Sequence, residues 1–123
     1  MILGVGIDLA VISRMDQALK RHNGRFEARV FTDGERADCG KSANPAQHYA
    51  ARFAAKEAAV KACPPLRGQS WHDVEVVKEP DGRPRLRLHG PAAEAAAASG
   101  VARLHVSLSH DGDNAIAMVV AED

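Results

Sequence analysis

The sequence feature that most constrains the fold is the stretch "ARFAAKEAAVKA", residues 51–62, which has the composition of a stable helix. Upstream, Asn44-Pro45 supplies an N-cap and a proline at the first helical position, and Pro64-Pro65 ends the helix downstream. Spacing of about 100° per residue puts five alanines on one broad arc, namely Ala54, Ala55, Ala58, Ala59 and Ala62. Because alanine lets a neighbouring backbone approach closely, we expect this alanine arc to pack tightly, including between subunits.

The opposite arc of this helix mixes apolar and charged side chains. Phe53 and Val60 lie at its centre, Glu57 and Lys61 flank them on one side, and Lys56 flanks them on the other. Glu57 and Lys61 have the favourable i,i+4 orientation of a surface ion pair, which contributes a few tenths of a kcal/mol. A charge beside residues that favour burial is costly, however, unless it is paired or bound to a metal. Both interpretations of Glu57 stay open at this point.

Length and composition limit the class of protein. We expect residues 1–123 to form a single domain with its own core, built from aliphatic side chains because aromatic residues make up only 4%. Sixteen basic and sixteen acidic residues cancel, which argues against binding nucleic acid or a membrane through a global field. No apolar run approaches the roughly 20 residues needed to span a bilayer. Without a CxxC pair or a secretory N-terminus, we expect a soluble, cytoplasmic protein with reduced cysteines.

The pattern along the chain predicts an α+β fold. Alternation of apolar and polar residues predicts five strands, over residues 2–8, 71–78, 85–89, 104–110 and 115–121. Helices are expected from a Ser13 cap to Asn23-Gly24, after the capping pair Thr32 and Glu35, from Asn44 to Ala62, and over residues 91–99. The turns "EPDGRP" and "DGDN" each join two strands in a hairpin. The order β-ααα-ββ-α-ββ, without regular βαβ alternation, indicates a largely antiparallel sheet.

The first predicted strand ends in an acid, Asp8, whose neighbours on the same face are Gly4 and Gly6. The two glycines leave room beside Asp8 for a ligand to approach closely. An aspartate at the end of a strand is more often a turn former or a helix cap. Two carboxylates from distant segments, Asp8 and Glu57, together with Lys61, can nevertheless form a site for Mg²⁺, which leaves water and phosphate to complete its coordination.

The segment "HVSLSHDGDNA", residues 105–115, carries hydroxyl, imidazole and carboxylate groups. A serine hydrolase triad is excluded because Ser109, His110 and Asp111 are consecutive and project in different directions. A zinc site is excluded because His105 and His110 are an odd number of residues apart on a strand and therefore face opposite sides. The strand end can hold a phosphate or can cap its own turn, and the sequence leaves both readings open.

Positive charge is concentrated after the first strand. Between residues 13 and 30 five basic residues outnumber two acidic ones, and three of them lie on one side of the predicted helix and its exit. We refer to these three, Arg14, Arg21 and Arg25, as the basic stripe. Such charges usually form a solvated face, and the alternative is that they dock an acidic helix of a partner protein.

Three motifs occur in a specific order and spacing: "GVGIDLAVISR", "RFAAKEAAVKA" and "HVSLSH". They resemble, respectively, the N-terminal G-x-D motif with its following arginine, the R-F-x-x-K-E-A-x-x-K-A signature and the closing strand of the holo-acyl-carrier-protein synthase family. This family comprises the short, trimeric phosphopantetheinyl transferases. "DGRPRLRLHG" also resembles the family's hairpin before the last helix, so the resemblance covers nearly the whole chain. The sequence departs from the pattern at "CPPLRGQS", residues 63–70, where the family usually has a glycine-rich loop.

The resemblance implies transfer of 4'-phosphopantetheine from coenzyme A to a serine hydroxyl of an apo acyl carrier protein. Adenosine 3',5'-bisphosphate would be released. Carried over by motif, Asp8 and Glu57 would hold Mg²⁺ against the pyrophosphate, and Lys61 would neutralise developing phosphate charge. These three residues would therefore form the catalytic group. Fatty acid biosynthesis is the expected pathway, and a carrier protein of a polyketide or other synthase stays an open alternative.

The resemblance also implies further ligand contacts and an assembly. Arg52, Ser109 and His110, together with Lys61, would contact the phosphates and nucleotide of coenzyme A. The basic stripe would dock the acyl carrier protein. Family members are homotrimers with sites between protomers, so we expect a homotrimer in which Ser109 and His110 serve a site whose acids come from a neighbour.

Two other classes of function are weaker. A non-catalytic coenzyme A binding module would keep Arg52 and His110 and dispense with the acids, but both acids are present. A carrier-protein binding module would need only the basic stripe and would leave the spacing of Glu57 and Lys61 unexplained. The sequence does not identify the carrier, the acylated coenzymes that are tolerated, or the general base.

Overall fold

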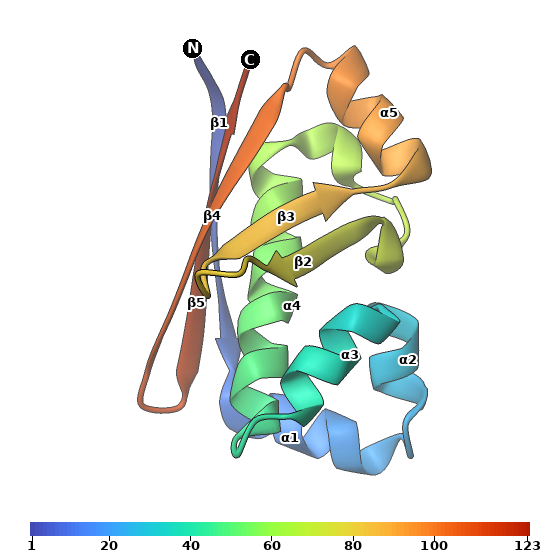
Figure 1. Cartoon of the computed structure of the whole chain (residues 1–123), viewed down its shortest axis with the longest axis vertical. Coiled ribbons are helices and arrows are strands. Elements are labelled where there is room, and N and C mark those ends of the chain that lie inside the picture. Colours follow the sequence, from blue (N-terminus) through green and yellow to red (C-terminus); the bar gives the residue numbers. More distant parts are fainter.

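The computed structural model, which describes residues 1–123, is organised around one long helix that lies against a three-stranded sheet (Figure 1). The sheet has the antiparallel order β1-β5-β4, with β1 at Ile2–Val11, β5 at Asn114–Glu122 and β4 at Arg103–Asp111. The long helix is α4, Pro45–Ala62. A separate antiparallel hairpin consists of β2, Val74–Lys78, and β3, Pro84–Leu88. No helix is long and apolar enough to cross a membrane.

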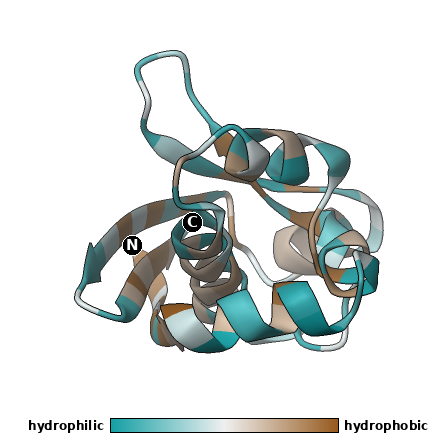
Figure 2. Cartoon of the chain, turned by 90° about the horizontal axis from the view of Figure 1, so that it is seen from below, coloured by the Kyte–Doolittle hydropathy of each residue, from teal (hydrophilic) through white to brown (hydrophobic).

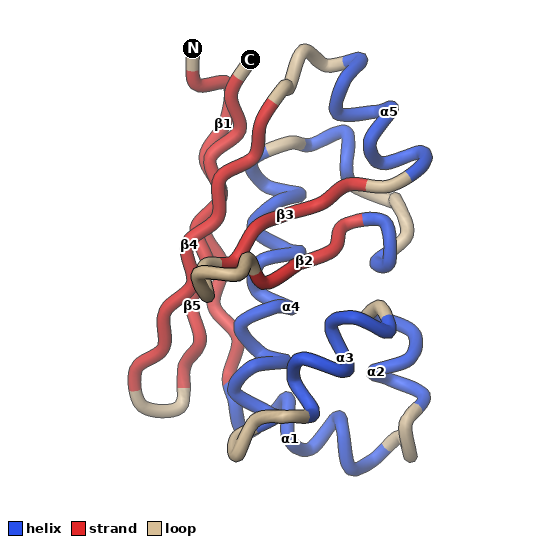
Figure 3. Tube along the Cα trace, viewed as in Figure 1, coloured by secondary structure: helices blue, strands red, loops and turns tan.

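The remaining helices lie toward the two ends of α4 (Figures 1 and 3). Those at one end are α1 (Ile12–Arg21), α2 (Arg25–Val30) and α3 (Asp33–Gly40), and the helix at the other end is α5 (Gly90–Ala98). The predicted α+β class and element order are confirmed, with the short α2 as an addition. The second predicted strand, over residues 71–78, starts later than expected, because Trp71–Asp73 forms a 3₁₀ turn and β2 begins only at Val74.

Glycines bring strand β1 into direct contact with α4. A Cβ atom added to Gly6 would lie 2.0 Å from the carbonyl oxygen of Ala58, and one added to Gly4 would lie 2.0 Å from that of Ala62. No side chain fits at these distances, so the two positions require glycine for the strand to lie where it does.

The alanine arc of α4 faces this contact and is buried inside the chain. Its five members are at most 3% exposed and belong to the main hydrophobic core. The expectation that the arc contacts another subunit is therefore wrong, because β1 and β5 already cover it. Close packing was the correct part of the expectation, and the partner is this chain's own sheet.

The outer face of the sheet is apolar and exposed. We call the five residues Leu3, Val5, Ile7, Leu9 and Met118 the exposed sheet face, and each is between 44% and 59% exposed. Figure 2 shows hydrophobic positions along these strands. Strand β1 thus turns its glycines toward α4 and its large aliphatic side chains toward solvent, as its alternation requires. An apolar patch of this kind marks an interaction surface more often than a free surface.

Helix α1 begins differently from the prediction. It starts at Ile12, and Ser13 is not its N-cap. Instead Asp113, in the β4–β5 turn, accepts hydrogen bonds from the backbone N–H and the hydroxyl of Ser13 at 3.0 and 2.6 Å. Asp16, three residues after Ser13, pairs with Lys20 at 2.8 Å. The cap of α1 is therefore supplied from a turn 100 residues further along the chain.

The predicted capping box at the start of α3 is confirmed. The Thr32 hydroxyl accepts from the Glu35 N–H at 3.1 Å, and the Glu35 carboxylate accepts from the Thr32 N–H at 2.9 Å. The same carboxylate is completely buried and also accepts from the ammonium of Lys56, itself 1% exposed, at 2.9 Å. A capping residue thus serves a second purpose as the partner of a buried lysine.

The Lys56–Glu35 pair has its hydrogen bonds satisfied. Lys56 Nζ also donates to the carbonyl oxygens of Trp71 and Val74, at 2.9 and 2.6 Å. The second oxygen of Glu35 accepts from the N–H of Val76 at 2.9 Å. Burial lowers the pKa of Lys56, and the nearby carboxylate of Glu35 opposes that change. The pair therefore connects α4 to α3, to the 3₁₀ turn and to β2.

Replacing Lys56 by Met should lower the free energy of unfolding by about 3–5 kcal/mol, because the carboxylate of Glu35 is left buried without a partner. Urea unfolding at neutral pH measures this loss. The double variant Lys56→Met/Glu35→Gln should recover part of it, since no uncompensated charge remains. Lys20→Met, which breaks an exposed pair, should change stability by less than about 1 kcal/mol. A loss at Lys56 as small as that at Lys20 would contradict the assigned role.

Candidate active site

The site residues predicted from the sequence form two separate groups. The first contains Asp8 and Lys61, which lie 53 positions apart in the sequence. Lys61 Nζ donates to Asp8 Oδ1 at 3.0 Å and to the carbonyl oxygen of Ile7 at 3.0 Å. The side chain of Lys61 is 52% exposed and that of Asp8 is 23% exposed, so the pair borders solvent. The close approach of β1 to α4 at Gly6 makes this contact possible.

Glu57 lies one turn before Lys61 on α4 but does not pair with it. The ordinary surface ion pair between these two residues is thus absent, because Lys61 is directed to Asp8 instead. Glu57 has no hydrogen-bond or ion-pair partner and is partly buried. It lines a cleft of about 390 Å³ together with Lys61 and the loop at residues 66–71. A partly buried carboxylate without a protein partner is free to take a cation.

The donor set of this group suits one kind of metal ion. No cluster of three or more His, Cys, Asp or Glu side chains is arranged to hold a metal. Mg²⁺ does not need such a cage, because it keeps several waters and binds through one or two carboxylates and substrate phosphates. Glu57 lines an open cleft and Asp8 contacts Lys61, which lines the same cleft, so the hard oxygen donors of both carboxylates fit that mode of binding.

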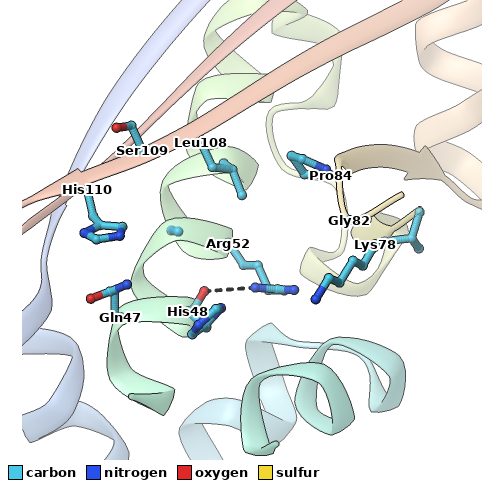
Figure 4. A pocket seen from close by; sticks show the side chains of 11 residues that line it. Gln47, His48, Arg52, Lys78, Gly82, Pro84, Leu108, Ser109 and His110 are labelled. Carbon is cyan, nitrogen blue, oxygen red and sulfur yellow. Dashed lines mark hydrogen bonds between the residues drawn. The ribbon is translucent and has the colours of Figure 1, made fainter. Parts of the chain in front are cut away.

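The second group lines a pocket of about 280 Å³ between α4, the β2–β3 hairpin and β4 (Figure 4). Arg52, Ser109 and His110, all predicted from the sequence as coenzyme A contacts, lie around this pocket. In Figure 4 the side chains of Arg52 and Lys78 extend toward each other, with His48 beside Arg52. The structure thus brings Arg52 and His110 to one pocket and separates them from the acids, while Figure 4 shows the hydroxyl of Ser109 directed away from Arg52 on the other side of the strand.

The electrostatics of this pocket favour an anion. Arg52 is only 7% exposed, its Nη1 donates to the carbonyl oxygen of His48 at 3.5 Å, and its Nε has no partner. A buried guanidinium carries a positive charge that is costly without a counter-ion, and an anion in the pocket would reduce that cost. Burial and the nearby charges of Arg52, Lys78 and His110 lower the pKa of His48. No carboxylate lines the pocket, so its charged side chains are all basic.

Sequence reasoning missed two members of this pocket, His48 and Lys78. His48 precedes Arg52 by four residues on α4, so the i,i+4 spacing could have placed it on the same side of the helix. Lys78 ends strand β2 beside the hairpin turn, and no local pattern distinguishes it from other exposed strand residues. Only the packing of the hairpin against α4 reveals its place.

The basic stripe is fully available to a partner. Arg14 and Arg21 belong to α1 and Arg25 begins α2, and all three are exposed. None of them takes part in a salt bridge. Three unpaired guanidinium groups on neighbouring helices form a local positive patch on a chain whose formal net charge is zero.

Comparison with known proteins identifies the chain. A sequence model described as the 4'-phosphopantetheinyl transferase superfamily matches residues 4–119. The chain belongs to this superfamily. It is 51% identical to the holo-[acyl-carrier-protein] synthase of Geobacter metallireducens over 124 residues, covering 99% of this chain and 98% of that protein. It is 52% identical to the enzyme of the same name from Methylobacterium radiotolerans over 128 residues, covering 99% of this chain and 94% of that protein.

Solved structures agree with this assignment. The chain matches the holo-[acyl-carrier-protein] synthase from Neisseria meningitidis with a TM-score of 0.88 at 28% identity, covering 100% of both chains. It matches the Helicobacter pylori enzyme in complex with coenzyme A with a TM-score of 0.81 at 29% identity. The match covers 96% of this chain and 99% of that chain. The prediction of a phosphopantetheinyl transferase fold and enzyme class from the three motifs is confirmed.

Proposed function

We propose that this transferase moves 4'-phosphopantetheine from coenzyme A to a serine hydroxyl of an apo acyl carrier protein. Adenosine 3',5'-bisphosphate is the second product. The relatives named holo-[acyl-carrier-protein] synthase and the coenzyme A complex among the structural matches support the substrates. The observation that carries the proposal is the contact of Lys61 with Asp8 at 3.0 Å, beside a Glu57 that has no protein partner.

Asp8 and Glu57 would hold Mg²⁺ through their carboxylate oxygens. Mg²⁺ bound there would neutralise charge on the diphosphate and polarise its phosphoryl oxygens. Lys61 is held in position by Asp8 and the Ile7 carbonyl, and its ammonium would neutralise the charge that develops on the phosphate. Phosphoryl transfer depends mainly on positioning and charge neutralisation, so the attacking serine needs only a modest base.

The pocket around Arg52 would receive the phosphates of the nucleotide end of coenzyme A. The guanidinium of Arg52 and the basic side chains of Lys78 and His110 give it the charge for this ligand. The neutral form of His48 can supply a hydrogen bond at its edge, whereas the hydroxyl of Ser109 points away from this pocket (Figure 4).

We also propose that the enzyme is a cytoplasmic homotrimer in fatty acid biosynthesis. Glu57 and Lys61 line one cavity of the chain, and Arg52 with His110 lines another, so one protomer presents two half-sites. Packing of the exposed sheet face against neighbours would bury its five large apolar side chains and could unite the acids of one protomer with the Arg52 pocket of the next.

The central experiment is to incubate the protein with coenzyme A, Mg²⁺ and a panel of apo carrier proteins. Mass spectrometry should show one phosphopantetheine adduct on the preferred carrier. Chelation of the metal should abolish the adduct. If no carrier in the panel is modified, the proposed reaction is wrong for this chain.

Asp8→Asn and Glu57→Gln should each slow transfer by more than about 100-fold, because each removes a charged ligand of the same ion. The double variant should be little slower than either single variant, since residues that act as a unit give non-additive losses. Initial rates at several Mg²⁺ concentrations provide the measurement. Lys61→Met should slow turnover and leave the metal dependence intact. A nearly silent Glu57→Gln would show that Glu57 holds no catalytic ion.

Ile7→Asp should convert the trimer to a monomer, because it places a charge in the centre of the exposed sheet face. Light scattering after size exclusion gives the mass of the assembly, and the transfer assay should show loss of activity together with dissociation. Ala97→Asp, an equal charge change at an exposed position of α5, should leave the trimer intact. A wild-type protein that is monomeric and active would refute the shared site.

Arg14→Glu should raise the KM for the carrier by about tenfold and leave the affinity for coenzyme A unchanged, because the carrier presents negative charge to the basic stripe. Steady-state kinetics with carrier and coenzyme A varied separately distinguish the two effects. The difference from wild type should shrink at high salt. The control is Arg87→Glu, which reverses the charge of an exposed arginine of β3. It should change neither the KM for the carrier nor the affinity for coenzyme A. Equal weakening of coenzyme A binding would assign Arg14 another role.

A further inference from the structure

The loop after α4 lacks the backbone groups that a glycine-rich phosphate-binding loop provides. Such loops bind anions through free N–H groups that point to the ligand. Here Pro64 and Pro65 have no N–H at all. They open a 3₁₀ turn, Pro64–Leu66, that follows directly after the end of the helix.

Four of the remaining N–H groups of the loop are used within the chain. The bonds run from Cys63 to Ala59, Leu66 to Cys63, Arg67 to Pro64 and Gln69 to Leu66, at 2.9 to 3.1 Å. Between residues 63 and 70, Gly68 and Ser70 keep a backbone N–H that is not bonded to another main-chain group. The backbone of this loop therefore contributes two donors at most to a phosphate, and neither comes from the segment 63–67 that directly follows the helix.

The loop instead carries a cationic side chain at the cleft. Arg67 is exposed, lines the same cleft as Glu57 and Lys61, and takes part in no salt bridge or hydrogen bond through its side chain. Its neighbour Leu66 is 1% exposed and belongs to the main core, which anchors the loop next to Arg67. Glu57 is the only carboxylate among the lining residues of the cleft.

We propose that the guanidinium of Arg67 binds the diphosphate of coenzyme A in the cleft that it shares with Glu57 and Lys61, where the loop backbone offers few free donors. The proposal rests on the proposed function, in which Glu57 and Lys61 mark the transfer site. A guanidinium offers several N–H donors in a planar fork and binds phosphate oxygens in pairs, which a single N–H cannot do. Two prolines and a buried leucine restrict the backbone that carries Arg67. Little conformational entropy is therefore lost by this backbone when the anion binds.

Titration calorimetry of coenzyme A binding, without a carrier protein, tests the proposal. Arg67→Gln should raise the Kd by about tenfold or more, because a charged hydrogen bond to phosphate is lost. Arg67→Lys should restore part of the affinity, since an ammonium keeps the charge and loses the paired geometry. Arg87→Gln removes one exposed positive charge elsewhere and should leave the Kd unchanged.

A second ligand identifies which phosphate Arg67 contacts. Dephospho-coenzyme A keeps the diphosphate and lacks the 3'-phosphate, so Arg67→Gln should weaken it by the same factor as coenzyme A. A loss confined to coenzyme A would assign Arg67 to the 3'-phosphate and overturn the proposal. An unchanged Kd with a raised KM for the carrier would assign it to the carrier protein, and an unchanged Kd and KM would assign it no role.

The outcomes separate this proposal from the proposed function. Failure of the proposed function would be seen in the wild-type protein, as absence of transfer, or in Glu57→Gln, as unchanged turnover. Neither observation involves Arg67. If both tests succeed and Arg67→Gln binds coenzyme A normally, only the role of Arg67 is wrong.

Discussion

Lys56 and Glu35 form an ion pair that is almost completely withdrawn from water, and four elements take their positions from it. Its hydrogen bonds run from α4 to α3, to the 3₁₀ turn at Trp71 and to β2. Because Lys56 precedes Glu57, the pair also fixes the rotation of α4 about its axis, and hence the direction of the Glu57 side chain. Separating a buried charge from its partner is costly, so the helix has one favoured orientation.

Strand β1 serves two different purposes on its two faces. Its inner face is glycine where it crosses α4, which lets the strand approach until Asp8 reaches Lys61. Its outer face carries the exposed aliphatic side chains. The period-two alternation of a strand separates these purposes completely, so the residues that place the acid do not compete with those that form the exposed sheet face.

The sequence predicted those features that depend on neighbouring residues or on motifs. The capping box of Thr32 and Glu35, the proline start of α4 and both hairpins depend on local chemistry and were found. Asp8 and Lys61 were assigned to one site because the motifs indicated it, and the structure does bring them together. The features that were missed depend on contacts between distant segments. Asp113 replaced Ser13 as the cap of α1, and β1 covered the alanine arc.

The contact of Gly6 with α4 also limits how this sequence can change. Any side chain at Gly6 would overlap the carbonyl oxygen of Ala58, so a substitution must move the strand or the helix. The same movement would open the core and separate Asp8 from Lys61. At most positions of an enzyme, selection can exchange a little stability for activity or the reverse. At this position the two cannot vary independently, and a substitution that harms folding also misplaces the acid.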